Sequence, residues 1–224
     1  MIKTVLFDLD DTLFDFQAAE HRAIRNTFAD LGLEPTDSLI SRYSEINLSR
    51  WKLLEQGVLT RKEVINSRFE ILFSELGKNI LPEDANKVYW DYLSQGYDYI
   101  DGAEELLIKI YKKYDLYAVS NGSTVVQKRR IRGTGVDRFF KDIFISEIIG
   151  YDKPSIEFFN ACFSKIDGFK KEEAIIIGDS LSADIKGGKN AGVKTCWFNP
   201  RGKEGEADFI IRSLKEIPNL LERI

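Results

Sequence analysis

The sequence has little histidine and little cysteine: one histidine, His21, and two cysteines, Cys162 and Cys196, in 224 residues. A Ser-His-Asp enzyme would have to use His21, which lies in a segment of helical character with no serine or cysteine nucleophile signature beside it. The two cysteines are far apart, so the sequence has neither a disulfide framework nor a zinc-binding spacing. Each lies in an apolar stretch, and we expect both to be small buried residues.

Long apolar runs and an excess of positive charge are also missing. No run approaches the ~18 apolar residues that a membrane-spanning helix requires, and the apolar run at residues 1–7 is too short for a signal peptide. We therefore expect a cytoplasmic protein without a membrane partner. The formal net charge is -4, so a nucleic-acid polymer is not expected as a partner either. The densest basic cluster, Lys128, Arg129, Arg130 and Arg132, is interpreted as a solvated helix face.

The chain does contain enough apolar residues, 43% of the total, to bury one core and a smaller module. Residues 2–7 are β-branched and apolar, which predicts a buried strand that ends at the acidic run 8–11. From residue 16 to about residue 95, apolar side chains recur every three or four positions, which predicts four or five helices and no strand.

After Gly102 the pattern becomes an alternation of helices and short apolar strands. Strands are predicted at 116–119, 143–145, 174–177, 193–197 and 209–211, and helices at 103–113, 124–132, 155–165 and 182–191. The strands lack polar alternation, as in sheets covered on both faces. The predicted fold is therefore α/β, a doubly wound, Rossmann-like parallel sheet. Its core comprises residues 1–15 and 97–224, and an all-helical domain, residues 16–96, is inserted after the first strand.

Polar side chains follow three of these strands where each strand ends. Asp8 follows the first strand, Ser120 and Asn121 follow strand 116–119, and Asp179 follows strand 174–177. Ligands of open parallel sheets bind outside the carboxyl ends of the strands, where the winding reverses. If the first strand is central, these residues line one crevice.

The acids of this crevice require cations. Asp8, Asp10, Asp179 and Asp184 would lie close together, which is unfavourable unless positive charge compensates them. Lys153 would supply one charge, and Mg2+, which prefers a few oxygen ligands and a phosphate, would supply the rest. Asp8 and Asp10 are two positions apart and would point to the same side, so one can attack while the other transfers protons.

Four motifs in this order resemble those of the haloacid dehalogenase superfamily. They are Asp-Leu-Asp-Asp-Thr at 8–12, Val-Ser-Asn-Gly at 119–122, Lys-Pro at 153–154, and Gly-Asp at 178–179 with Asp184 further on. The resemblance covers the whole core, and the helical insert is similar to the type-one cap of that superfamily.

The resemblance implies a role for each matched residue. Asp8 would be the nucleophile that forms an aspartyl-phosphate, and Asp10 would protonate the leaving oxygen and then deprotonate the attacking water. Magnesium would be held by the Asp8 carboxylate, the Asp10 backbone carbonyl and Asp179. The phosphoryl oxygens would be bound by a set that opens a helix or carries charge: Ser120, Asn121, Gly122 and Lys153.

Two other polar residues of the motifs receive ancillary roles. Asp184 would orient Lys153 or a metal-bound water, and Thr12 would hold the loop after the first strand by a bond near Asp8. Asp11 is interpreted as turn chemistry alone.

Asp10 also indicates the branch of the superfamily, because a halide leaving group needs no acid whereas an alkoxide does. Cap and core together resemble the bacterial pyrimidine 5′-nucleotidases, which implies a (deoxy)pyrimidine nucleoside 5′-monophosphate as the small-molecule substrate. Candidate residues of the substrate pocket are aromatic or polar: Phe14, Phe16, Asn47 and Trp51.

Two alternatives remain open. A phosphosugar or broad-specificity phosphatase, or a mutase, would use the same core chemistry. A non-catalytic phospho-acceptor domain would also place acids and a lysine at strand ends. We expect a monomer or a weak homodimer.

Overall fold

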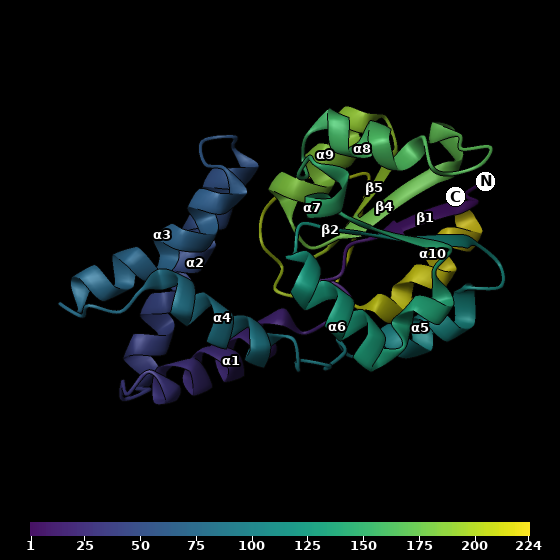
Figure 1. Cartoon of the computed structure of the whole chain (residues 1–224). Helices are drawn as coiled ribbons and strands as arrows, with labels where there is room; N and C mark the ends of the chain where they lie inside the picture. The colour runs from purple at the N-terminus through teal and green to yellow at the C-terminus, as the bar shows by residue number, and fades with distance from the viewer. The chain divides into compact units, whose positions relative to one another are not determined.

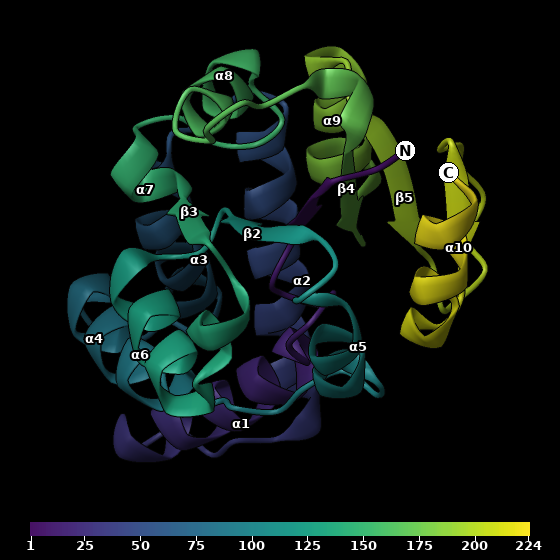
Figure 2. The same ribbon diagram turned by 90° about the vertical axis from the view of Figure 1, so that its right-hand side faces the viewer.

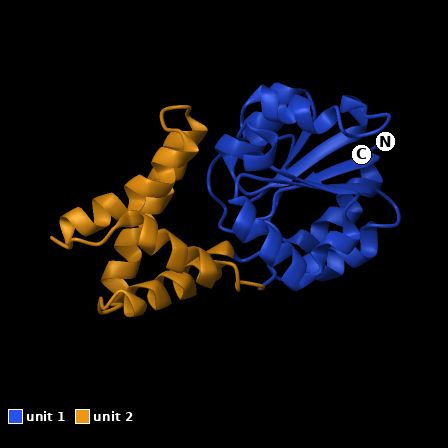
Figure 3. Cartoon of the chain, viewed as in Figure 1, with its two compact units in different colours: residues 1–15, 98–224 blue, residues 16–97 orange.

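The computed structural model describes residues 1–224, and the chain forms two compact units (Figure 3). The core unit comprises Met1–Asp15 and Asp98–Ile224, and the helical unit comprises Phe16–Tyr97. No helix combines the length and the apolar character that crossing a membrane would require.

The core unit is built on a six-stranded, all-parallel sheet in the order β3-β2-β1-β4-β5-β6. Figure 1 labels β1, β2, β4 and β5 of this sheet. The first strand pairs with β2 on one side and β4 on the other, so the chain winds outward in both directions from it. The predicted doubly wound α/β fold with a helical insert after the first strand is therefore confirmed. The strands are β1 (Thr4–Phe7), β2 (Asp115–Ser120), β3 (Asp142–Ile145), β4 (Ala174–Gly178), β5 (Lys194–Phe198) and β6 (Phe209–Ile211).

Helices cover both faces of this sheet, and Figure 2 shows α8 and α9 on one side and α5 and α10 on the other. Alternate residues of a strand point to opposite faces; Phe7 thus joins one apolar cluster and Leu6 the other. Both cysteines are free and buried, as predicted. The helices are α5 (Ala103–Ile110), α6 (Thr124–Thr134), α7 (Ser146–Ile149), α8 (Ile156–Phe163), α9 (Lys186–Ala191) and α10 (Ile217–Arg223).

The helical unit contains α1 (Phe16–Asp30), α2 (Asp37–Glu55), α3 (Arg61–Glu75) and α4 (Pro82–Leu93). Helix α3 begins where its sequence signals a start: Thr60 and Glu63 form a capping box in which each side chain accepts a bond from the other's backbone. Aromatic side chains fill the interior, with Tyr43 in ring contact with Phe28, Phe69 and Tyr89.

The structure departs from the predicted elements mainly around short turns of helix. The predicted helix 182–191 begins instead as a π-helical turn, Leu181–Ile185, and becomes α-helical at Lys186. Helix α7 has four residues, too few to produce an apolar period, so the sequence pattern gave no sign of it.

Candidate active site

The register of the sheet brings Asp8 to the carboxyl ends of three adjacent strands. Phe7 pairs with Ala118 of β2 and with Ile177 of β4. The backbone N–H of Asp8 then donates to the carbonyl of Ile177 at 2.9 Å, which continues the ladder by one residue. Asp8 thus lies between the end of β2, where Ser120 lies, and the end of β4, which Asp179 follows.

Lys153 is the central cation of this site. Its side chain is 2% exposed, and its Nζ donates to Asp8 Oδ1 at 2.6 Å, to Asp184 Oδ1 at 2.7 Å and to the carbonyl of Val119 at 3.0 Å. Burial alone would lower the pKa of the Lys153 ammonium, but the carboxylates of Asp184 and Asp8 outweigh it and raise the pKa above its ordinary value. Lys153 therefore stays charged, and all three of its N–H groups donate hydrogen bonds within the site.

The acids around Lys153 outnumber it. Burial raises the pKa of Asp8 to about 8, an effect that Lys153 opposes and that Asp184 and Asp10 increase. Burial, followed by the charges of Asp8 and Asp184, raises the pKa of Asp179 well above its ordinary value. Both shifts reflect like charges held together away from water, a cost that a bound cation would remove.

The donor set fits a hard divalent cation. One carboxylate oxygen from each of Asp8, Asp179 and Asp184 lies within 4.8 Å of the others. Oxygen ligands without nitrogen or sulfur are those that Mg2+ and Ca2+ prefer. The side chain of Asp10 is not part of this group, which leaves its backbone carbonyl as the only ligand it would offer.

Asp184 is fixed by the π-helical turn after β4. Its Oδ2 accepts from the backbone N–H of Ser180 at 3.1 Å, while its Oδ1 accepts from Lys153. Of the two predicted roles for Asp184, the structure contains the direct contact with Lys153.

Asn121 holds the backbone of Lys153 rather than pointing freely into the site. Its Nδ2 donates to the Lys153 carbonyl at 2.9 Å, and its Oδ1 accepts from the Lys153 backbone N–H at 2.8 Å. This pair of bonds fixes the position from which the lysine side chain starts. A direct contact between Asn121 and a phosphoryl oxygen stays a prediction, as do those of Ser120 and Gly122.

Asp10 has partners that the sequence analysis missed. Arg130 Nη1 donates to Asp10 Oδ1, and Gln127 Nε2 donates to Asp10 Oδ2 at 2.7 Å. The interpretation of the basic cluster as a solvated face is correct for Lys128, Arg129 and Arg132, which are exposed, and wrong for Arg130, which is 1% exposed. Its spacing of three from Gln127 puts both on the buried face of α6.

The loop after β1 is held by its backbone. The predicted bond from Thr12 is wrong: its hydroxyl is buried without a hydrogen-bond partner. Backbone N–H groups close the loop instead, from Leu13 and Phe14 to the carbonyl of Leu9 at 2.9 and 2.8 Å. Asp11 has φ 59°, a left-handed conformation that aspartate tolerates better than most residues, so its interpretation as a turn residue is confirmed.

The predicted pocket residues differ in their exposure. Phe14 is fully buried between Arg130 and Tyr99, so it belongs to the core and offers no ring face to a ligand; its predicted pocket role is wrong. Phe16, at the start of α1, is partly exposed.

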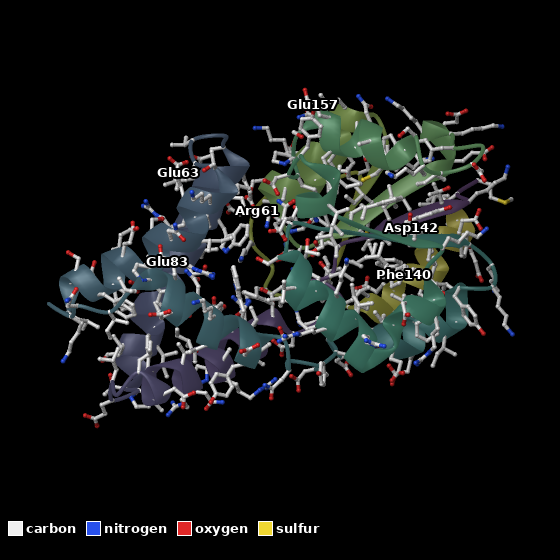
Figure 4. The ribbon with its side chains drawn as sticks, viewed as in Figure 1. Arg61, Glu63, Glu83, Phe140, Asp142 and Glu157 are labelled. Carbon is white, nitrogen blue, oxygen red and sulfur yellow. The ribbon has the colours of Figure 1, made fainter.

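In the helical unit, Asn47 is the centre of a buried polar network. Its Nδ2 donates to Glu20 at 2.5 Å, and its Oδ1 accepts from Trp51 Nε1 and Arg68 Nη1, each at 3.1 Å. Trp51 is partly exposed, with the guanidinium of Arg61, labelled in Figure 4, 5.5 Å from its ring centroid. Asn47 therefore orients the indole, and contact of Trp51 or Phe16 with a substrate stays a prediction.

Comparisons with known proteins agree with this geometry. The family model for haloacid dehalogenase-like hydrolases matches residues 5–198. The HAD-hydrolase YfnB of Bacillus subtilis is 43% identical over 98% of this chain and 95% of its own. Its crystal structure, bound to magnesium, superposes with a TM-score of 0.94 at 42% identity over 98% of each chain.

Two further relatives carry the names of phosphatases. The pyrimidine 5′-nucleotidase PynA of Streptococcus pneumoniae is 39% identical over 99% of this chain and 98% of its own. The glyceraldehyde 3-phosphate phosphatase of Pyrococcus furiosus is 31% identical over 99% of this chain and 94% of its own.

Replacing the central cation tests its contribution to the fold. Lys153→Met leaves Asp8 and Asp184 buried without their positive partner, and we expect the free energy of unfolding in metal-free urea titrations to fall by about 3–5 kcal/mol. Lys165→Met, an exposed lysine of the same unit, should change it by less than about 0.5 kcal/mol. Equal stability of the two variants would contradict the account.

Proposed function

The chain belongs to the haloacid dehalogenase-like hydrolase family, and on this premise we propose that it is a magnesium-dependent phosphatase with Asp8 as its covalent nucleophile. The observation that carries the proposal is the different environment of the two acids at the end of β1. Asp8 is buried against Lys153, whereas Asp10 is held by Arg130 and Gln127 with 26% of its side chain exposed.

The proposed reaction has two steps that both use Asp8 and Asp10. An Asp8 carboxylate oxygen attacks phosphorus, the ester P–O bond breaks, and Asp10 gives its proton to the leaving alkoxide. Water then attacks the phosphorus of the aspartyl-phosphate, Asp10 takes the water proton, and the Asp8–phosphorus bond breaks to return the carboxylate. The protons balance over one turnover, and the products are an alcohol and inorganic phosphate.

Lys153 would stabilise charge in both steps. It neutralises the Asp8 carboxylate at rest, and after attack the negative charge lies on the phosphoryl oxygens beside the same ammonium. Asn121 keeps the lysine backbone in place. Mg2+ held by Asp8, Asp179 and the Asp10 carbonyl would supply further positive charge to the phosphoryl group.

The substrate is proposed to be a (deoxy)pyrimidine nucleoside 5′-monophosphate, with residues 1–15 and 97–224 as catalytic core and 16–96 as cap. This choice is supported by the relative named pyrimidine 5′-nucleotidase, to which the chain is 39% identical over 99% of its length. Trp51 is the side chain of the helical unit best suited to stack on a base, because Asn47 orients its indole and leaves it partly exposed. A phosphosugar is the second candidate, favoured by the relative named glyceraldehyde 3-phosphate phosphatase.

A substrate panel tests the proposed function. With Mg2+ present, we expect phosphate release from dUMP, dTMP and UMP to exceed release from AMP, glucose 6-phosphate and glyceraldehyde 3-phosphate by about tenfold or more in kcat/KM, since the base would add binding energy. The reverse order would support the phosphosugar candidate and contradict the nucleotidase assignment. Absence of turnover on every phosphomonoester would favour a non-catalytic phospho-acceptor.

Removing the nucleophile tests the covalent step. Asp8→Asn keeps the volume but loses the attacking oxygen anion, and we expect kcat to fall by about 10³-fold or more. Asp11→Asn is the matched control, because asparagine also tolerates the left-handed conformation at that position. Circular dichroism verifies that both variants fold, and substantial turnover by Asp8→Asn would exclude Asp8 as the nucleophile.

Removing the metal tests the cation site. We expect excess EDTA to abolish phosphate release and added Mg2+ to restore it. In the absence of substrate, Mg2+ should also raise the Tm of the wild-type protein, because it binds the folded acid cluster and relieves its like-charge repulsion. Asp179→Asn should lose most of that Tm increase. Full activity in EDTA, or an equal Tm increase in Asp179→Asn, would argue against the site.

A further inference from the structure

The geometry points to a role for Arg130 and Gln127 that goes beyond the motif residues. We propose that both are positioning residues, which hold the Asp10 carboxylate in the orientation needed for its proton transfers. The inference rests on the proposed function, since it specifies how the acid and base of that reaction is aimed.

The two side chains hold Asp10 from its protected side. Arg130 takes one carboxylate oxygen and Gln127 takes the other, the latter at 2.7 Å. Arg130 and Gln127 are each 1% exposed, whereas the Asp10 side chain keeps 26% of its surface open. Two buried donors thus hold the Asp10 carboxylate while part of its surface stays exposed. A group that exchanges protons with a substrate requires such an exposed surface.

Arg130 is itself fixed against the loop that carries Asp10. Its guanidinium lies 4.8 Å from the ring centroid of the fully buried Phe14. The backbone of Phe14 accepts from Asp11 N–H at 2.7 Å and donates to Leu9 at 2.8 Å. Arg130 and Asp10 are therefore both positioned by the same hydrogen-bonded turn, residues 9–14.

Gln127 connects Asp10 to Ser120, one of the residues proposed to bind the phosphoryl oxygens. Its Oε1 faces Arg130 Nη1 at 3.4 Å, which turns its amide nitrogen toward Asp10 and Ser120. That nitrogen donates to Asp10 Oδ2 and, at 2.8 Å, to Ser120 Oγ. Gly122 makes room for this arrangement, because a Cβ there would come within 2.7 Å of Gln127 Cγ. The buried amide of Gln127 therefore bridges Asp10 and Ser120.

A positioning role predicts a dependence on the leaving group. A poor leaving group such as a sugar alkoxide needs the Asp10 proton in the transition state, whereas p-nitrophenolate leaves readily without it. A misdirected Asp10 should therefore slow alkyl esters much more than p-nitrophenyl phosphate. A purely structural contribution would lower both rates together.

The test uses four methionine variants of one helix in the full-length protein with Mg2+. Arg130→Met and Gln127→Met remove the two anchors, and Lys128→Met and Arg132→Met change exposed neighbours. For the alkyl phosphate that the wild type cleaves fastest, the anchor variants should lose about 30-fold or more in kcat. For p-nitrophenyl phosphate they should lose less than about threefold, with KM little changed, and the two controls should match the wild type. Arg130→Lys should recover part of the loss.

A cycle with Asp10→Asn completes the experiment. If the anchors act through Asp10, adding Gln127→Met or Arg130→Met to Asp10→Asn should change kcat by less than about twofold. Equal losses on both esters, additive losses in the cycle, or no loss would overturn the proposal. Gln127→Met alters no charge and keeps the outcome decisive should Arg130→Met not fold. Wild-type inactivity on both esters would instead contradict the proposed function and this inference with it.

Discussion

The ion pairs of Lys153 are the interaction on which the site depends. A buried ammonium bonded to Asp8 at 2.6 Å and to Asp184 at 2.7 Å allows carboxylates to accumulate where strands of a parallel sheet end. Neither the lysine nor the acids would be tolerated there alone, since an unpaired buried charge costs several kcal/mol. Burial, and then the charges of Asp8 and Asp184, raise the pKa of Asp179, and a divalent cation bound there would favour its charged form.

Asp8 and Asp10 are two positions apart in the chain, and each pairs with a different cation. Asp8 pairs with Lys153, which lies in the loop before α8, and Asp10 pairs with Arg130 of α6. The sharp turn between β1 and α1, with Asp11 at φ 59°, separates the two environments over a few residues. In the proposed mechanism, Asp8 would be the nucleophile beside a fixed ammonium and Asp10 the acid with an exposed face, as phosphoryl transfer followed by hydrolysis requires. The fold supplies both because β1 lies at the centre of its sheet.

The sequence predicted what depends on local patterns. Apolar strands that end in polar residues indicated the parallel sheet and the positions of Asp8 and Asp179, because each signal lies within one strand and the residues after it. Burial of Arg130 depends on how α6 packs against a loop more than a hundred residues earlier, and no local period records such a contact. The predictions for Thr12 and Phe14 failed for the same reason. Residue type suggested a hydrogen bond from Thr12 and an exposed ring at Phe14, but tertiary packing buries the hydroxyl without a partner and covers the ring.

The most direct measurement of the central claim is the chemical identity of the intermediate. Enzyme mixed with Mg2+ and its best phosphomonoester, quenched in acid within the first turnovers and digested, should yield the peptide containing Asp8 with one phosphoryl group attached to that residue by mass spectrometry. The modification should disappear once substrate is exhausted. A phosphoryl group on a different residue, or turnover with Asp8 unmodified throughout, would contradict covalent catalysis at Asp8.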